Sequence, residues 1–164
     1  INRLMLTLEP DSTFKLKTIR EIIQALNDDM VVIIFPSGQL EPDPAIVPGA
    51  AEALQGWSDS IGVFLNKVPK TRLLPVLVSG ILTEKAWNSR FAKFGPTQKR
   101  RHQFAMATQF VAQRFSKKPH WKRPLQIDIG QAKLPEVLDP NLDPRMLNQA
   151  VRQEMLDLLE KVYP

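Results

Sequence analysis

The most constraining feature of the sequence is a run of six apolar residues, Met30–Phe35, followed at once by Pro36, Ser37 and Gly38. The run is rich in β-branched residues and shows no alternation of polar and apolar positions, which is typical of a strand buried on both faces of a sheet. Proline and glycine directly after it predict a tight turn that ends the strand. A chain with such a strand must cover its sheet with further layers on both sides.

The rest of the chain alternates between strand-like and helix-like patterns. Leu73–Ser79 predicts a second buried strand, near an edge or irregular at its start because of Pro75, and Leu125–Ile129 predicts a half-exposed strand. Helices are predicted over Thr18–Asn27, Gly49–Gln55, Gln98–Phe115 and Arg145–Val162. This order is typical of an α/β fold with a mixed sheet flanked by helices. Neither a repeat nor an obvious linker interrupts the 164 residues, so we expect one domain over residues 1–164.

Positive charge is concentrated in one stretch of the chain, Lys85–Arg123. It contains eleven Lys and Arg residues and no Asp or Glu, whereas the whole chain has a net charge of +5. It also holds seven of the twelve aromatic residues. Basic and aromatic residues together favour contact with an anionic membrane surface or with nucleic acid. The helical spacing and the lack of a known nucleic-acid motif make nucleic acid the less favoured partner. A solvated basic face over core aromatics is the third interpretation.

Composition and spacing exclude or disfavour several kinds of chemistry. The absence of cysteine excludes disulfides, thiolate catalysis and cysteine-ligated metals. His102 and His120 have no Asp or Glu within five residues on either side, so we interpret both as ordinary histidines. Ser37 lacks the Gly-x-Ser-x-Gly frame of a hydrolase nucleophile. We therefore expect no metal site and no cofactor. No apolar run approaches the roughly 20 residues that span a bilayer.

The strand and turn at Val31–Gly38 (VVIIFPSG) resemble the third motif of the glycerolipid acyltransferase superfamily, of the lysophosphatidic acid and glycerol-3-phosphate acyltransferase type. That motif is usually an apolar strand followed by Phe-Pro-Glu-Gly-Thr-Arg. Leu74–Gly80 resembles the fourth motif, an apolar strand of Val-Pro-Val type. Leu8–Asp11, Pro48–Ala51 and Leu125–Gly130 resemble further segments in the family's order. The resemblance therefore covers nearly all of the chain.

The resemblance implies a glycerolipid-acyltransferase-like fold and an O-acyltransferase activity. Such an enzyme moves an acyl group from acyl-CoA or acyl-carrier protein to a hydroxyl of a glycerophosphate or lysophospholipid acceptor. It implies substrate-binding roles for Ser37, Gly38, Gln39 and for a basic residue, Arg3 or Lys17, with Lys15 a further choice. It places Pro75 and Val76 at the acyl site. It also gives the basic stretch a role in membrane contact, for which we select Trp87, Lys117, Lys118, Trp121, Lys122 and Arg123.

The chain departs from the family's pattern at two places. Ser37 stands where the family usually has Glu, and Gln39-Leu40 where it has Thr-Arg, so the acceptor is left open. The His-x-x-x-x-Asp motif is missing, because the fifth residue after His102 is Ala107 and the fifth after His120 is Leu125. The resemblance therefore implies that these residues are the later two-thirds of a domain whose general base lies upstream. No catalytic residue is assigned in this chain, and we expect the chain alone to be inactive.

Two classes of function follow from these patterns. The first is a cytoplasmic acyltransferase that is peripheral at a membrane, with a lipid acceptor and an anionic membrane surface as partners. The alternative is a noncatalytic module that binds an anionic surface or a nucleic acid through the basic stretch.

Overall fold

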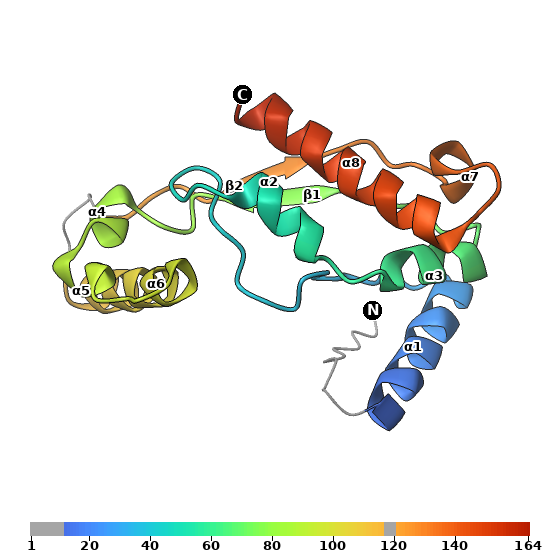
Figure 1. Cartoon of the computed structure of the whole chain (residues 1–164), viewed down its shortest axis with the longest axis horizontal. Coiled ribbons are helices and arrows are strands. Elements are labelled where there is room, and N and C mark those ends of the chain that lie inside the picture. Colours follow the sequence, from blue (N-terminus) through green and yellow to red (C-terminus); the bar gives the residue numbers. More distant parts are fainter. Residues whose placement is uncertain (1–11, 117–120) are drawn as a thin grey trace. The chain divides into compact units, whose positions relative to one another are not determined.

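The computed structural model describes residues 12–116 and 121–164 (Figure 1). Within them the chain is mostly helical, with eight α-helices and one two-stranded antiparallel sheet. The helices are α1 (Ser12–Asn27), α2 (Ala50–Ala53), α3 (Ser60–Lys67), α4 (Glu84–Trp87), α5 (Arg90–Lys93), α6 (Gln98–Phe115), α7 (Pro135–Leu138) and α8 (Pro144–Val162), with a 3₁₀ turn at Leu54–Gly56. The strands are β1 (Val76–Ser79) and β2 (Gln126–Ile129). The fold is therefore mixed α/β, with a smaller sheet than the sequence predicts.

The chain forms two compact units. Unit 1 comprises the residues up to Gln39, Trp57–Leu74 and Ala132–Gln153. Unit 2 comprises Leu40–Gly56, Pro75–Gln131 and Glu154–Pro164. Helix α8 contributes its residues up to Gln153 to unit 1 and the remainder to unit 2. The expectation of a single domain over the whole chain stays a prediction.

Unit 1 is built around helices α1 and α3. The buried core consists of Ile22 and Leu26 of α1, Phe64 of α3, and Val68, which directly follows α3. Helix α1 confirms the predicted helix and begins earlier, at Ser12. It ends in a Schellman motif: Asp29 has a positive φ of 56°, and the N–H of Met30 donates to the carbonyl of Ala25 at 2.9 Å. This turn directs the chain from α1 into the apolar run.

The apolar run is extended but forms no strand pairing with the described residues. Its side chains alternate: Val32 and Ile34 pack on the α1–α3 core, whereas Val31, Ile33 and Phe35 are 91%, 79% and 80% exposed. The prediction that Met30–Phe35 is a strand buried on both faces is therefore wrong for this structure. Apolar, β-branched residues favour extended backbone, but burial on both faces also requires neighbouring strands and a second layer.

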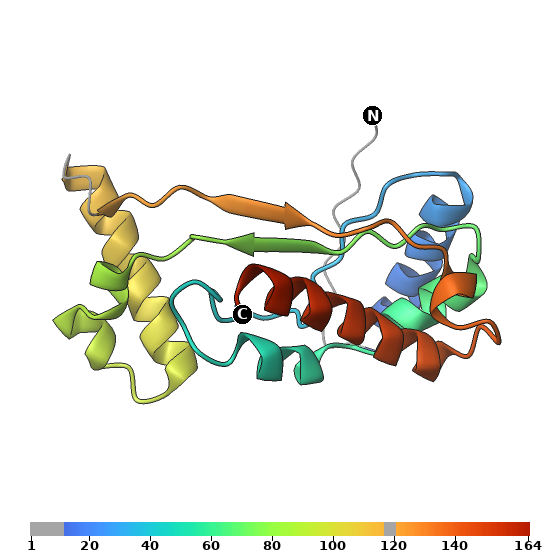
Figure 2. The same ribbon diagram turned by 90° about the horizontal axis from the view of Figure 1, so that it is seen from above.

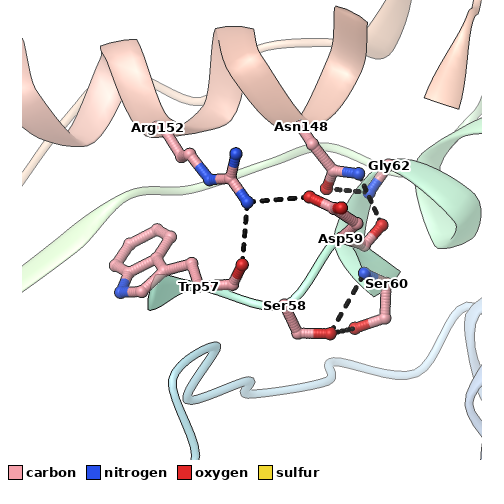
Figure 3. Close-up of polar contacts among 7 residues, drawn as sticks. All are labelled: Trp57, Ser58, Asp59, Ser60, Gly62, Asn148 and Arg152. Carbon is pink, nitrogen blue, oxygen red and sulfur yellow. Dashed lines mark hydrogen bonds and ion pairs between the residues drawn. The ribbon is translucent and has the colours of Figure 1, made fainter. Parts of the chain in front are cut away.

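Polar side chains of α8 fasten the start of α3 within unit 1 (Figure 3). The Asn148 side chain accepts from the N–H of Gly62 at 2.7 Å and donates to the carbonyl of Asp59. One turn further along, Arg152 donates to the carbonyl of Trp57 and to the carboxylate of Asp59, both at 2.7 Å. A side chain on Gly62 would collide with the carbonyl of Pro144. The close approach of these two segments therefore depends on glycine at position 62.

Unit 2 contains the sheet. Strands β1 and β2 run antiparallel, side by side (Figure 2), with Val76 opposite Ile129 and Val78 opposite Ile127. These four side chains share one face of the ribbon, and all four are exposed. The second predicted strand is thus confirmed in part, because it pairs with β2 but is not buried on both faces. Strand β2 confirms the strand predicted at Leu125–Ile129 but is more exposed than predicted, because Ile127 and Ile129 both face outward.

Helices α4, α5 and α6 pack together in unit 2 (Figure 2). Each begins with a hydroxyl cap, since Thr83, Ser89 and Thr97 accept a hydrogen bond from a backbone N–H of the first turn. The buried cluster they enclose is Val47, Leu82, Ala86, Trp87, Ala92 and Ala105. Helix α6 confirms the predicted helix at Gln98–Phe115. In the described part of the chain, no helix is long and apolar enough to cross a membrane.

Candidate functional site

The turn after the apolar run forms where the sequence predicts it, in unit 1. The N–H of Gly38 donates to the carbonyl of Phe35 at 3.1 Å, which closes the turn. The Ser37 hydroxyl accepts from the N–H of Gln39 at 3.2 Å and donates to the carbonyl of the same residue at 3.1 Å. The N–H of Ser58 donates a hydrogen bond to the carbonyl of Pro36 at 3.1 Å, which anchors the turn. Ser37 and Gln39 are therefore brought together, with the Ser37 hydroxyl turned onto the backbone.

Gly38 leaves the surface of this turn open. Its φ is +59°, in the left-handed region that favours glycine, and no atom lies within 4 Å of the place where a Cβ would be. Gly38 and Gln39 are exposed. A ligand can thus approach the backbone of the turn closely, and the local bonds of Ser37 can exchange for bonds to a hydroxyl or phosphate.

Of the two basic residues selected for the acceptor's phosphate, only one can be placed. Lys17 lies on α1, where its Nζ is 3.8 Å from a carboxylate oxygen of Glu21, and its side chain is 72% exposed. Surface pairs of this i, i+4 type contribute only about 0.3–0.5 kcal/mol, so the Lys17 ammonium can leave Glu21 for an anion at little cost. Arg3 and the side chain of Lys15 lie outside what the structure describes.

Pro75 and Val76 belong to unit 2, at the start of the β1–β2 ribbon. The carbonyl of Pro75 accepts from the N–H of Gly130 at 2.9 Å, ahead of the regular pairing. The regular strand begins only after Pro75, at Val76. Val76 faces outward with Val78, Ile127 and Ile129 on the apolar side of the ribbon. Chemically, such an uncovered apolar face suits an acyl chain.

The two tryptophans of the basic stretch are buried to different extents. Trp87 is only 9% exposed, and the Arg101 guanidinium lies 3.9 Å from the centre of its ring. Trp121 is half-buried against the same core, with the Nζ of Lys85 5.0 Å from its ring centre. Trp87 therefore does not fit the membrane-contact role that we selected for it, because its ring would have to leave the core.

The basic residues selected beside these tryptophans remain at the surface where they are described. Lys122 and Arg123 are exposed and line a shallow cavity of about 340 Å³ together with Thr83, Glu84 and Lys85. Lys117 and Lys118 lie outside the described residues. The three cations around this cavity suit an anionic surface, although Glu84 offsets part of their charge.

A buried carboxylate that the sequence analysis did not single out holds the end of β1. Asp43 is 4% exposed and accepts hydrogen bonds from the N–H groups of Ala45, Gly80 and Leu82 at 3.1, 3.2 and 2.9 Å. His102 is also buried; desolvation lowers its pKa, and the charge of Asp43 raises the pKa in part. Since its carboxylate oxygens serve backbone groups, we interpret Asp43 as structural. No cluster of metal-ligating side chains occurs among residues 12–116 and 121–164.

Comparison of the chain with known protein families, with curated proteins and with solved structures gives no significant match.

Proposed function

We propose that these residues form the acceptor- and acyl-binding part of an acyltransferase of the glycerolipid type. The observation that carries the proposal is the open, left-handed turn at Gly38, which follows an apolar segment at the place of the glycine in the family's third motif. The paired strand β1, which contains the residues resembling the fourth motif, is further support.

The proposed reaction is attack of an acceptor hydroxyl on an acyl thioester. The hydroxyl oxygen forms a bond to the carbonyl carbon, the carbon–sulfur bond breaks, and the thiolate of coenzyme A or acyl-carrier protein leaves. The hydroxyl proton passes to a general base, for which we propose a histidine of a His-x-x-x-x-Asp motif outside these 164 residues. No cofactor takes part.

The residues present here would bind and orient the substrates. Gly38 would allow close approach to the backbone, and Ser37 and Gln39 would hydrogen-bond the acceptor. Lys17 or Arg3 would hold its phosphate, since an ammonium or guanidinium supplies the charge-assisted donors that phosphate needs. Pro75 and Val76 would contact the acyl chain.

The finer fold that we propose is a mixed sheet in which the apolar run becomes a strand. Val31, Ile33 and Phe35 leave one side of the run uncovered, and its backbone has no strand partner among the described residues. Further strands of a complete acyltransferase domain would pair with the backbone of the run, and helices packed over them would cover its exposed side. In such a domain we propose that the enzyme works peripherally at the cytoplasmic face of a membrane.

The proposal can be tested by following release of free thiol from acyl-CoA in the complete protein. Gly38→Val should abolish transfer because it both strains the backbone and crowds the acceptor. Gly56→Val is the matched control, because Gly56 has equally open surroundings and no positive φ, and it should leave the rate unchanged. Gly38→Asn separates the two effects, since asparagine tolerates a left-handed backbone but still crowds the site.

Ser37→Glu restores the residue that the family usually carries, so transfer to a glycerophosphate acceptor should be kept or raised. The 164-residue chain alone should release no thiol. Unchanged kinetics in the Gly38→Val and Gly38→Asn variants, with their melting temperatures intact, would place the site elsewhere and overturn the proposal.

A further inference from the structure

Helices α5 and α6 carry a group of exposed apolar side chains that the membrane-contact prediction did not include. Of the five phenylalanines that are exposed in the described part of the chain, four lie on these helices or at the end of α5. We call the group the phenylalanine face. It consists of the exposed Phe91, Phe94, Phe110, Val111 and Phe115 and of the partly buried Phe104.

The phenylalanine face extends over both helices. At about 100° per residue, Phe104, Val111 and Phe115 fall within roughly 40° of one another around α6. The buried residues of α6, His102, Ala105 and Gln109, lie on the other side of the helix, toward the core of unit 2. The ring of Phe91 on α5 packs on Phe104, with ring centres 5.0 Å apart and an interplanar angle of 37°. Phe91, Phe104, Val111 and Phe115 therefore share one surface, and Phe110 lies about 100° around α6 from Val111.

Cationic side chains are interleaved with these rings. Arg90 and Lys93 are exposed on α5, and Arg100 and Arg114 are exposed on α6. Viewed along the axis of α6, Arg100 and Arg114 lie at angles between those of Phe110 and Val111. No acidic residue occurs from Lys85 to Arg123. Long basic side chains can keep their charged ends in the headgroup layer while apolar neighbours lie deeper, which is the arrangement of a helix that rests in a membrane interface.

We propose that the phenylalanine face lies in the interface of an anionic lipid bilayer, with Arg90, Lys93, Arg100 and Arg114 at its headgroups. This inference deepens the proposed function by naming the surface of membrane contact, and it replaces Trp87 in that role. A second copy of the chain would bring the same cations together on both sides, which disfavours self-association through this face. A nucleic acid would match the cations but would leave Val111 without an apolar partner.

The first test measures partitioning of the full chain onto vesicles of phosphatidylcholine alone and of an equimolar mixture with phosphatidylglycerol. The variant Phe94→Ser, Phe110→Ser, Phe115→Ser changes three well-exposed side chains, so the fold should persist. It should lose about a thousandfold of binding to the mixed vesicles, because each of the three buried phenylalanines contributes roughly tenfold or more. The matched control Leu16→Ser, Val137→Ser, Met146→Ser removes exposed apolar side chains elsewhere and should bind as the parent does.

The second test separates charge position from net charge. Changing Arg90, Lys93, Arg100 and Arg114 to Gln should reduce binding about a hundredfold to a thousandfold, from roughly 1 kcal/mol per cation near an anionic surface. The control changes Lys67, Arg72, Arg145 and Lys161 to Gln, which removes the same charge from exposed sites elsewhere. It should lose much less. High salt should weaken the parent's binding without abolishing it, because the apolar contribution is not screened.

A fluorescence reporter locates the contact. Phe110→Trp should shift its emission to the blue on addition of mixed vesicles, and Val137→Trp should not. Equal losses in the phenylalanine variant and its control, or equal binding to neutral and mixed vesicles, would overturn the proposal. So would displacement from vesicles by RNA, or a dimer that the phenylalanine variant dissolves.

The closing comparison distinguishes this proposal from the acyltransferase proposal. Transfer to glycerol 3-phosphate, a water-soluble acceptor, should be unchanged when the complete protein carries the phenylalanine variant, while vesicle binding falls. Vesicle binding that depends on the phenylalanine face in a protein that transfers no acyl group would support the surface and reject the enzyme. Acyl transfer by a protein whose vesicle binding does not depend on the phenylalanine face would support the enzyme and reject the surface.

Discussion

Two apolar segments that look alike in the sequence behave differently in the structure. Val31–Phe35 and Val76–Ser79 are both β-branched, both apolar at almost every position and both next to turn-forming residues. The second pairs with β2 along its whole length, whereas the first is extended beside the α1–α3 core without a strand partner among the described residues. Composition thus selects an extended backbone, but a second strand in register is what makes it a sheet.

The ends of the two segments also differ in how they are held. The chain after β1 is fixed by a buried carboxylate, Asp43, that accepts three backbone N–H groups. The chain after Phe35 is fixed by backbone bonds of an exposed turn and by Ser37. Because charged hydrogen bonds in a buried site are stronger and costlier to lose, we expect the β1 end to be the more rigid of the two.

The largest expected effect is that of Asp43→Ala. Removing the carboxylate leaves the buried N–H groups of Gly80 and Leu82 without an acceptor and should lower the free energy of unfolding by about 3 kcal/mol or more. Urea denaturation measures the loss. Asp28→Ala, at an exposed aspartate just before the other segment, should stay within about 0.5 kcal/mol. Similar losses in both variants would erase the contrast between the two ends.

The next effect concerns hydrogen exchange. Paired amides of β1 and β2 should exchange at least about a hundredfold more slowly than the amides of Val31–Phe35, because exchange of the sheet amides requires the ladder to open. Mass spectrometry of peptides covering each segment would measure the difference. Strong protection of Val31–Phe35 in the isolated chain would reveal a backbone partner for this segment.

A smaller effect should separate neighbouring residues of the unpaired segment. Ile34 packs on the α1–α3 core, and Ile33 points outward. Ile34→Ser should therefore cost about 1–2 kcal/mol of unfolding free energy, whereas Ile33→Ser should change it by less than about 0.5 kcal/mol. Thermal or urea melts would compare the two.

The smallest effect is a pH dependence confined to unit 2. Desolvation lowers the pKa of His102 from its ordinary value of 6.5, so the unfolded chain binds the proton at a higher pH than the folded chain does. The free energy of unfolding should therefore fall as the pH drops below about 6.5, and His102→Gln should remove this part of the slope. Exchange of β1 amides should accelerate on acidification in the parent more than in the variant, while the amides of Val31–Phe35 should show no such difference.

The sequence predicts helices better than strands in this chain, for a physical reason. Helices α1, α6 and α8 satisfy their own backbone groups, and an apolar stripe is a local signal. Burial of Leu147, Val151 and Leu158 confirms the stripe predicted for α8. The pairing of β1 depends on β2, about fifty residues away, and local patterns say little about such partners. The short helices α4 and α5 were not predicted, because four residues carry almost no periodicity.

The candidate site was predictable only where it is local. The turn at Gly38 forms as the proline and glycine predict. Lys17 and Pro75 were selected from the order of the family's motifs along the chain, and no local sequence pattern places either residue beside the turn. Trp87 was selected because it lies in a basic stretch, yet neighbours in sequence face opposite sides of a helix. The available signal for the phenylalanine face was the helical spacing of Phe104, Val111 and Phe115. This spacing places them on the side of α6 opposite the buried Ala105 and Gln109.

The contact between Gly62 and α8 has an evolutionary consequence. Any side chain at position 62 meets the carbonyl of Pro144, and the amide of Asn148 holds the Gly62 N–H. Mutations at these positions are therefore coupled: a descendant that acquires alanine at 62 must also shift the start of α8, which removes the reason for asparagine at 148. Lineages that keep this geometry should inherit glycine and asparagine together, 86 positions apart. That pair can trace remote kinship after overall sequence similarity has faded.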